Sequence, residues 1–270
     1  MRCARFGLLP CLLVLLCIPL RAQQAPVSSA PVAADPEAVN LLQASLLALM
    51  GGTTSLPSTI VASGTVTPVW DNSAVPSAVT IYVQGTAKIR WEENLPGGTT
   101  AFVLNGPNAQ SQIASTTTTL RPYEVAAKGI ENFPILLLSR WLSSGNVQLR
   151  LVGAEIIAGQ TVNHVSVLDF SQRTSPRNPW HHDGSRGQYE MYLDPTTSLP
   201  VRLHYFQDTS DDVLFSLLPV DIVYSNYQAT GGLVMPFTLA RYVKSTGTSV
   251  IQLQSIQHNA VINDQLFQVQ

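Results

Sequence analysis

The sequence predicts a mainly β protein of the α+β class, a curved antiparallel sheet with helices covering its concave face. Short runs in which apolar and polar residues alternate recur along most of the 270 residues, separated by Gly, Pro and Asn. Two segments with helical spacing of apolar residues interrupt them. A sheet of about a dozen strands tends to curl, and its concave face must be filled or covered. We therefore expect an unclosed barrel with the two helices on that face.

The N-terminal residues predict export. Two arginines precede an apolar run over residues 7–20, which has the length of a signal-peptide core and is short for a membrane span. We predict a signal peptide over residues 1–22 and an extracytoplasmic protein, with the periplasm favoured over secretion. An uncleaved anchor helix is one alternative. Lipid modification of Cys17 is another, disfavoured by the bulky residues before it.

Composition bounds the rest of the chain. All three cysteines lie in the leader, so disulfides and thiolate metal sites are excluded from the mature chain. Residues 23–34 form a polar, proline-punctuated linker, and residues 35–270 are long enough for one domain with a packed core. Without the three leader arginines, 12 basic side chains face 17 acidic ones. This acidic balance argues against a nucleic-acid partner.

The first helix is predicted over residues 36–50. Asp35 is a good N-cap, Pro36 suits the first turn and two glycines follow Met50. One face carries Val39, Leu42, Leu46, Leu49 and Met50. No charge occurs between Ala38 and Met50, although a surface helix usually carries a charged outer stripe. We expect this helix to be covered on most sides or to rest on something apolar.

The remaining elements follow from the same signals. A second helix is predicted over residues 133–142, with Arg140 as its one charge, and a short helical turn over 121–129. A long loop over residues 171–187 interrupts the succession of strands and short turns in the second half of the chain. The predicted strands cover residues 60–67, 79–85, 88–93, 100–104, 110–115, 147–152, 154–157, 162–170, 188–193, 200–206, 222–227, 233–243 and 249–258.

Catalytic signatures are not found in the sequence. There is no Gly-x-Ser-x-Gly elbow, no phosphate-binding glycine loop and no dinucleotide fingerprint. The acidic pairs at 92–93 and 211–212 are adjacent, so within a strand their carboxylates would point to opposite faces. We expect no enzymatic activity and no cofactor.

The long loop offers a candidate partner-docking segment. It carries Arg177, Trp180, His181 and His182, and is locally basic on an acidic chain. A merely solvated loop is the alternative interpretation. Its histidines lack the His-x-His or His-x3-His spacing of metal sites, so we expect no metal.

The two nearly uncharged helices favour an apolar cavity against the sheet. The alternative is that the same side chains simply form the core. The candidate cavity residues are Leu42, Leu46 and Leu49 on the first helix, Ile135, Leu136, Leu138 and Trp141 on the second, and Ile81, Val83, Trp91 and Val103 on the strands.

The order of short motifs in the second half resembles the outer-membrane lipoprotein carrier superfamily, the LolA/LolB-like proteins and their lipoprotein-sorting relatives. The matching segments are residues 192–194 with 199–203, residues 224–227 with 232–237, and residues 256–264 with Phe267; residues 90–92 and 105–106 fit less tightly. The resemblance covers about residues 37–268 in order of elements. Arg90 is nearest to the carriers' lid-locking arginine, whose strand motif this sequence does not clearly reproduce.

The resemblance implies an unclosed barrel with a helical lid over an apolar cavity that binds lipid or lipoprotein acyl chains, without catalytic residues. We therefore expect a monomeric, non-enzymatic extracytoplasmic protein that binds lipid or an acylated lipoprotein. The alternative is an envelope protein-interaction or sensor domain on the same scaffold, with a side-chain-filled cavity and its function in the loops. A hydrolase with an unrecognised site is a third, weaker hypothesis.

Overall fold

The computed structural model describes residues 34–69, 74–106, 108–113, 116–120, 129–172, 187–208 and 217–268. The predicted signal peptide, the linker before residue 34 and most of the helical turn at 121–129 lie outside these residues. So does most of the loop at 171–187, including Arg177, Trp180, His181 and His182. Those assignments stay predictions.

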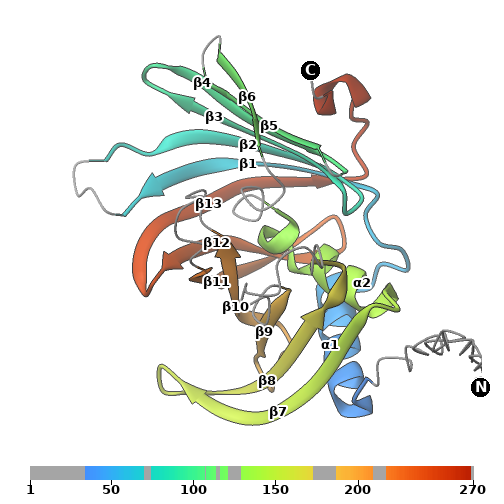
Figure 1. Ribbon diagram of the computed structural model, residues 1–270. Helices are drawn as coiled ribbons and strands as arrows, with labels where there is room; N and C mark the ends of the chain where they lie inside the picture. Colours follow the sequence, from blue (N-terminus) through green and yellow to red (C-terminus); the bar gives the residue numbers. More distant parts are fainter. Residues whose placement is uncertain are drawn as a thin grey trace, which may run out of the picture. The chain divides into compact units, whose positions relative to one another are not determined.

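The strands form a single antiparallel sheet (Figure 1). It has 13 strands in the order β6-β5-β4-β3-β2-β1-β13-β12-β11-β10-β9-β8-β7, so β6 and β7 are its two edges and the barrel is not closed. This confirms the predicted fold class. The strands are β1 (Thr59–Pro68), β2 (Ser77–Gln84), β3 (Lys88–Leu95), β4 (Gly98–Asn105), β5 (Asn108–Ile113), β6 (Thr116–Leu120), β7 (Val147–Ile157), β8 (Gln160–Asp169), β9 (Gln188–Leu193), β10 (Pro200–Asp208), β11 (Leu217–Thr230), β12 (Leu233–Val243) and β13 (Thr246–His258).

Two departures from the predicted strands have local causes. Residues 147–152 and 154–157 form the single strand β7, because its register shifts between Leu151 and Gly153 and leaves Val152 as an extra residue. Such a β-bulge bends a strand without ending it. Strand β6 was not predicted, since its sequence Thr-Thr-Thr-Thr-Leu has no alternation of apolar and polar residues.

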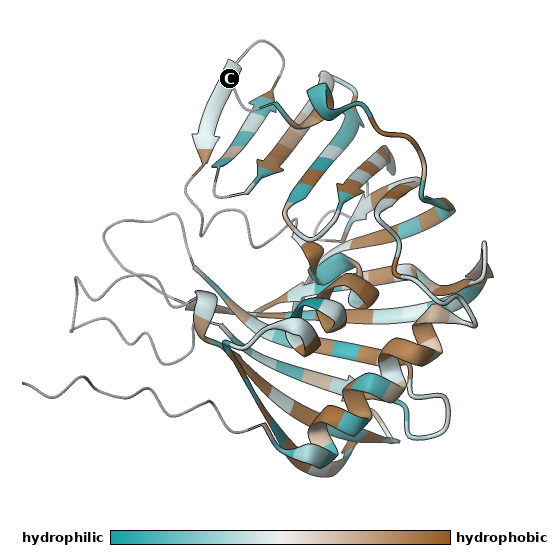
Figure 2. Ribbon diagram, turned by 90° about the vertical axis from the view of Figure 1, so that its right-hand side faces the viewer, coloured by the Kyte–Doolittle hydropathy of each residue, from teal (hydrophilic) through white to brown (hydrophobic). Residues whose placement is uncertain are grey.

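The two predicted helices are present as α1 (Pro36–Met50) and α2 (Pro134–Ser143). Short 3-10 turns occur at η2 (Ile130–Asn132), η3 (Phe170–Gln172) and η5 (Asp264–Phe267). Helix α1 contacts α2 and the strands β7 and β12, so it lies across the β7–β12 half of the sheet. Figure 2 shows apolar residues along both helices and, in alternation with polar ones, along the strands of the sheet.

The two helices are buried to different extents. Residues 134–138 and Trp141 of α2 are buried, consistent with a helix that is apolar almost all round. Helix α1 buries only the face that carries Leu42 and Leu49, while Leu47 on the other side is 67% exposed. Helix α1 thus rests on an apolar surface and is not covered on most sides.

Helix α1 is hydrogen-bonded to the sheet at its start and lies close to a turn of the sheet at its end. At its start, the Asp35 side chain accepts hydrogen bonds from the Glu37 amide (3.0 Å) and the Leu151 amide (3.1 Å), and the Asp35 amide donates to the Leu149 carbonyl (2.9 Å). The helix cap is therefore also a clamp on the edge strand β7. At its end, Gly51 has a left-handed φ of 56°, and a Cβ there would lie 2.5 Å from the Gly232 carbonyl oxygen in the β11–β12 turn.

The hydrogen bonds accepted by the Asp35 carboxylate should make the stability of the protein depend on pH. Hydrogen bonds from the Leu151 and Glu37 amides lower the pKa of Asp35 below its ordinary 3.8. A carboxyl with a lowered folded pKa stabilises the protein above its unfolded pKa, and this contribution disappears as the pH falls through the folded value. The D35N variant should therefore be less stable than the parent at pH 6, and the difference should shrink towards pH 2. Urea unfolding across this range measures it, and a difference that stays constant with pH would contradict the assignment.

Candidate functional site

Most of the predicted cavity residues meet in one apolar cluster. From α1 and α2 it contains Leu42, Leu49, Ile135, Leu136, Leu138 and Trp141, and from the strands Ile81, Val83 and Trp91. Leu46 is half-buried at the border of the cluster. The helix residues are packed closely, with Trp141 1% exposed and its ring centroid 5.2 Å from that of Tyr189.

Val103 lies outside this cluster, on the other face of the sheet. The register pairs Ile81 with Trp91 and Trp91 with Phe102, so these three side chains share one side of the sheet. Val103 is the next residue along β4 and pairs with Arg90, which places it on the opposite side. There Arg90 donates a hydrogen bond to the Leu266 carbonyl (3.1 Å), and η5 packs on β3 and β4.

Charged groups are buried beside the apolar cluster. Arg140 of α2 forms an ion pair with Asp169 at 2.9 Å, and Asp169 is 1% exposed. Glu131 is 5% exposed, and burial raises its pKa. The Tyr224 hydroxyl donates to the Glu131 carbonyl oxygen. In the sequence, only the lone charge of Arg140 on its helix indicates this cluster.

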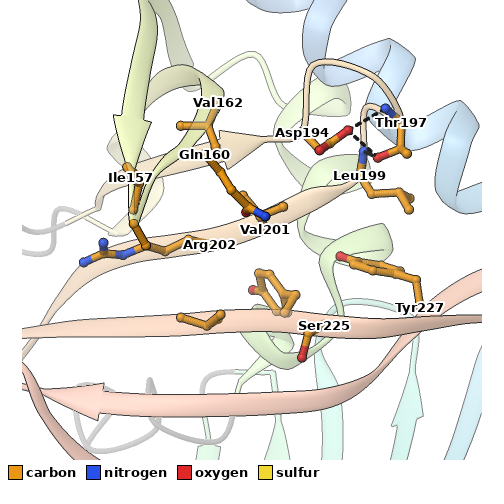
Figure 3. A pocket seen from close by; sticks show the side chains of 13 residues that line it. Ile157, Gln160, Val162, Asp194, Thr197, Leu199, Val201, Arg202, Ser225 and Tyr227 are labelled. Atoms are coloured by element: carbon orange, nitrogen blue, oxygen red, sulfur yellow. Dashed lines mark hydrogen bonds between the residues drawn. The ribbon is translucent and has the colours of Figure 1, made fainter.

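A pocket of about 490 Å³ lies where β10 and β11 separate. The two strands pair from Arg202–Val223 to Asp208–Leu217, and beyond the first of these pairs they diverge. The Tyr227 hydroxyl spans the gap and donates to the Pro200 carbonyl at 2.6 Å. The pocket is lined by Ile157, Ala158, Gln160, Val162, Asp194, Thr197, Leu199, Val201, Arg202, Val223, Tyr224, Ser225 and Tyr227 (Figure 3). None of these belongs to the predicted cavity.

Most of the pocket lies on the outer side of the sheet. Tyr224 points inward, because its hydroxyl reaches η2. Its neighbours Val223 and Ser225 therefore point outward, and Arg202, which pairs with Val223, does too. Tyr224 thus forms a wall shared by this pocket and the interior.

Arg202 connects the pocket to a polar network on the outer face. Its Nη2 and Nε lie 2.7 and 2.8 Å from Asp221 Oδ1, and the same oxygen contacts His204 Nδ1 at 2.9 Å. Burial raises the pKa of Asp221, but the hydrogen bonds from His204 and Arg202 lower it, and the net shift is downward. The guanidinium also lies 5.8 Å from the centre of the Tyr192 ring, which fixes it from a second side.

The Tyr192 ring also stacks on His164, with ring centroids 4.4 Å apart, and His164 lies between two carboxylates. Its ring nitrogens are 2.7 Å from Glu155 Oε1 and 2.7 Å from Glu190 Oε2. Among the described residues, no group of three or more His, Cys, Asp and Glu side chains is arranged to hold a metal ion. Within the same residues, no helix is long and apolar enough to span a membrane.

Comparisons with known proteins agree on the fold. No protein-family model and no curated protein matches the chain. A Vibrio parahaemolyticus domain described as outer membrane lipoprotein-sorting matches with a TM-score of 0.56 at 11% identity, over 86% of this chain and 96% of that one. A LolA superfamily protein from Nitrosomonas europaea matches with a TM-score of 0.53 at 12% identity, over 84% of this chain and 97% of that one.

A third match of the same quality is a DUF1329 family protein from Desulfovibrio piger, with a TM-score of 0.55 at 11% identity over 89% of this chain and 98% of that one. Identities this low establish a shared fold and leave function to be argued from the site. The chain therefore has the fold of LolA superfamily proteins and lipoprotein-sorting domains, as the order of its sequence motifs predicts.

Proposed function

We propose that this protein is exported to the periplasm and, as a monomer without enzymatic activity, binds an acyl chain of a lipid or lipoprotein. The chain would lie in the interior between the sheet and helices α1 and α2. The observation that carries the proposal is the attachment of α1. It crosses an apolar interior, is hydrogen-bonded to β7 through Asp35 at its start, and lies close to the β11–β12 turn at Gly51.

The residues between those ends are suited to making way for a ligand. Leu42 and Leu49 of α1 pack on the cluster through apolar contacts alone, which are non-directional and can be exchanged for contacts with an acyl chain. Each methylene that enters the interior contributes about 0.8 kcal/mol, so a long chain offsets the cost of displacing the helix. The side chains that would contact it are Leu42, Leu46, Leu49, Ile135, Leu136, Leu138, Trp141, Ile81, Val83 and Trp91.

The L46D variant tests the proposal. Leu46 is half-buried at the border of the cluster, so the sheet should tolerate the change, whereas an acyl chain would meet an ionised carboxylate. We expect at least roughly a tenfold loss of affinity for a long-chain lipid, the equivalent of about 1.4 kcal/mol. Native mass spectrometry of protein purified from its own envelope, with lipid extraction, gives the cargo and its occupancy.

The matched control is L47D, because Leu47 neighbours Leu46 on the same helix and is 67% exposed. It should keep full lipid occupancy. If L46D and L47D carry the same amount of lipid, the interior is not the binding site.

A second candidate function rests on the packing of the interior. Leu137 and Leu138 of α2 are 0% exposed and Trp141 is 1% exposed, so side chains already fill the space beneath this helix. A filled interior suits an interaction or sensor domain whose partner binds the loop with Arg177, Trp180, His181 and His182. A ligand-free mass with no uptake of added fatty acid or lipopeptide would favour it. Deleting residues 174–185 should then remove partner binding.

A further inference from the structure

We infer that the pocket between β10 and β11 binds an anionic single-chain amphiphile, with its apolar chain inside the pocket and its anion on Arg202. Arg202 lies on the outer side of the sheet, whereas Leu199, Tyr224 and Tyr227 border the interior cluster. The site uses none of the side chains proposed to bind a ligand in the interior. It does not depend on that proposal.

The lining of the pocket favours an apolar chain. Ile157, Val162, Leu199, Val201 and Val223 contribute aliphatic side chains from the turns and strands on both sides of the gap. The two tyrosines contribute mainly their rings, because both hydroxyls already donate to backbone carbonyls, at Pro200 and Glu131. A volume of about 490 Å³ falls within the roughly 300–1,000 Å³ of small-molecule sites.

The charges at the two sides of the pocket favour an anion and set its direction. Figure 3 shows Arg202 and Asp194 on opposite sides of the apolar group. The Asp194 carboxylate is already satisfied by the amides of Thr196 (3.0 Å) and Thr197 (2.7 Å) and by the Thr197 hydroxyl. It would repel a second negative charge, so the head group should lie at Arg202.

Arg202 can accept this anion without leaving a buried charge unpaired. Its Nε and Nη2 bind Asp221, and within the described residues its Nη1 has no hydrogen-bond or ion-pair partner. An arginine offers five N–H donors in a planar fork, so an incoming carboxylate or phosphate can use the open edge. Asp221 keeps His204 as its second partner.

Titration with decanoate, followed by calorimetry and by NMR amide shifts, tests the inference. We expect saturable binding that shifts the amides of β10 and β11, and no comparable binding of decyltrimethylammonium. Tighter binding of decyl phosphate than of decanoate would identify a phosphate head group as the natural source, and the reverse order a free fatty acid. Shifts confined to α1 and α2 would overturn the inference and support the interior site instead.

Two variants change the pocket in different ways, so that misfolding of one of them does not decide the test. R202M keeps the aliphatic stem and removes the charge, and should weaken decanoate binding on the order of tenfold. L199W fills the pocket and should abolish binding. The control is R150M, which removes an exposed arginine of β7 that lies outside the pocket. Equal affinity of the parent, R202M and L199W, each shown to be folded by circular dichroism, would overturn the assignment.

Discussion

Replacing Leu49 by alanine should lower the free energy of unfolding by about 2–5 kcal/mol, the range for removing a fully buried leucine side chain. Leu49 is 0% exposed and packs in the central cluster beneath α1. Alanine would leave a cavity beneath the helix, which adds to the lost burial of the side chain. Urea unfolding followed by circular dichroism measures the change.

Leu47 gives the matched control for this prediction. It is the same residue type, two positions earlier on the same helix, and 67% exposed. L47A should change the free energy of unfolding by no more than about 0.5 kcal/mol. Equal losses in the two variants would mean that α1 does not rest on the sheet through the Leu49 face.

Replacing Gly64 by alanine should destabilise the protein by about 1–3 kcal/mol or more, the range for inserting atoms into a packed site. A Cβ on Gly64 would lie 2.1 Å from the Gln252 carbonyl oxygen and 2.7 Å from the Leu253 Cα. Both atoms belong to the backbone of β13, so neither can rotate away. The register of β1 against β13 shifts between Ser63 and Gly64, and the close approach lies at this bulge.

The control for Gly64 is G97A. A Cβ on Gly97 meets nothing within 4 Å, and its φ lies outside the left-handed region, so alanine should be tolerated there. Thermal unfolding of both variants, at equal concentration and pH, gives the comparison. If G64A and G97A unfold at the same temperature, β1 and β13 have room to move apart at the bulge, and the sheet is packed less tightly there than the structure indicates.

The elements that the sequence predicts well are those with local signals. Asp35, Pro36 and Gly51 bound α1 through capping and backbone conformation, which depend only on near neighbours, and the helix has the predicted limits. Gly153 could have indicated the bulge in β7, because an isolated glycine in a strand pattern often does.

The site was predicted only in part because register is not a local property. Trp91 and Val103 both read as apolar strand residues, and their relative faces depend on which residues pair between β3 and β4. The pocket needs still more distant information. It exists because β10 and β11 stop pairing at Arg202 and Val223, and because turns from β7–β8 and β9–β10 reach the same place.

The place of β13 sets the order in which the molecule can assemble. It is the last of the described strands in sequence order, yet it pairs with β1 on one side and β12 on the other, in the middle of the sheet. Strands β1–β6 and β7–β12 are each joined by neighbouring pairings and can form as the chain appears. Until residues 246–258 arrive, each half exposes an unpaired edge, β1 or β12, to any other strand nearby. The two halves can therefore join only after β13 is available, and pairing between segments so distant in sequence is expected to be slow and exposed to aggregation. A chain truncated just before Thr246 would lack the strand that joins β1 to β12, and the two parts of the sheet would not be connected by hydrogen bonds between strands.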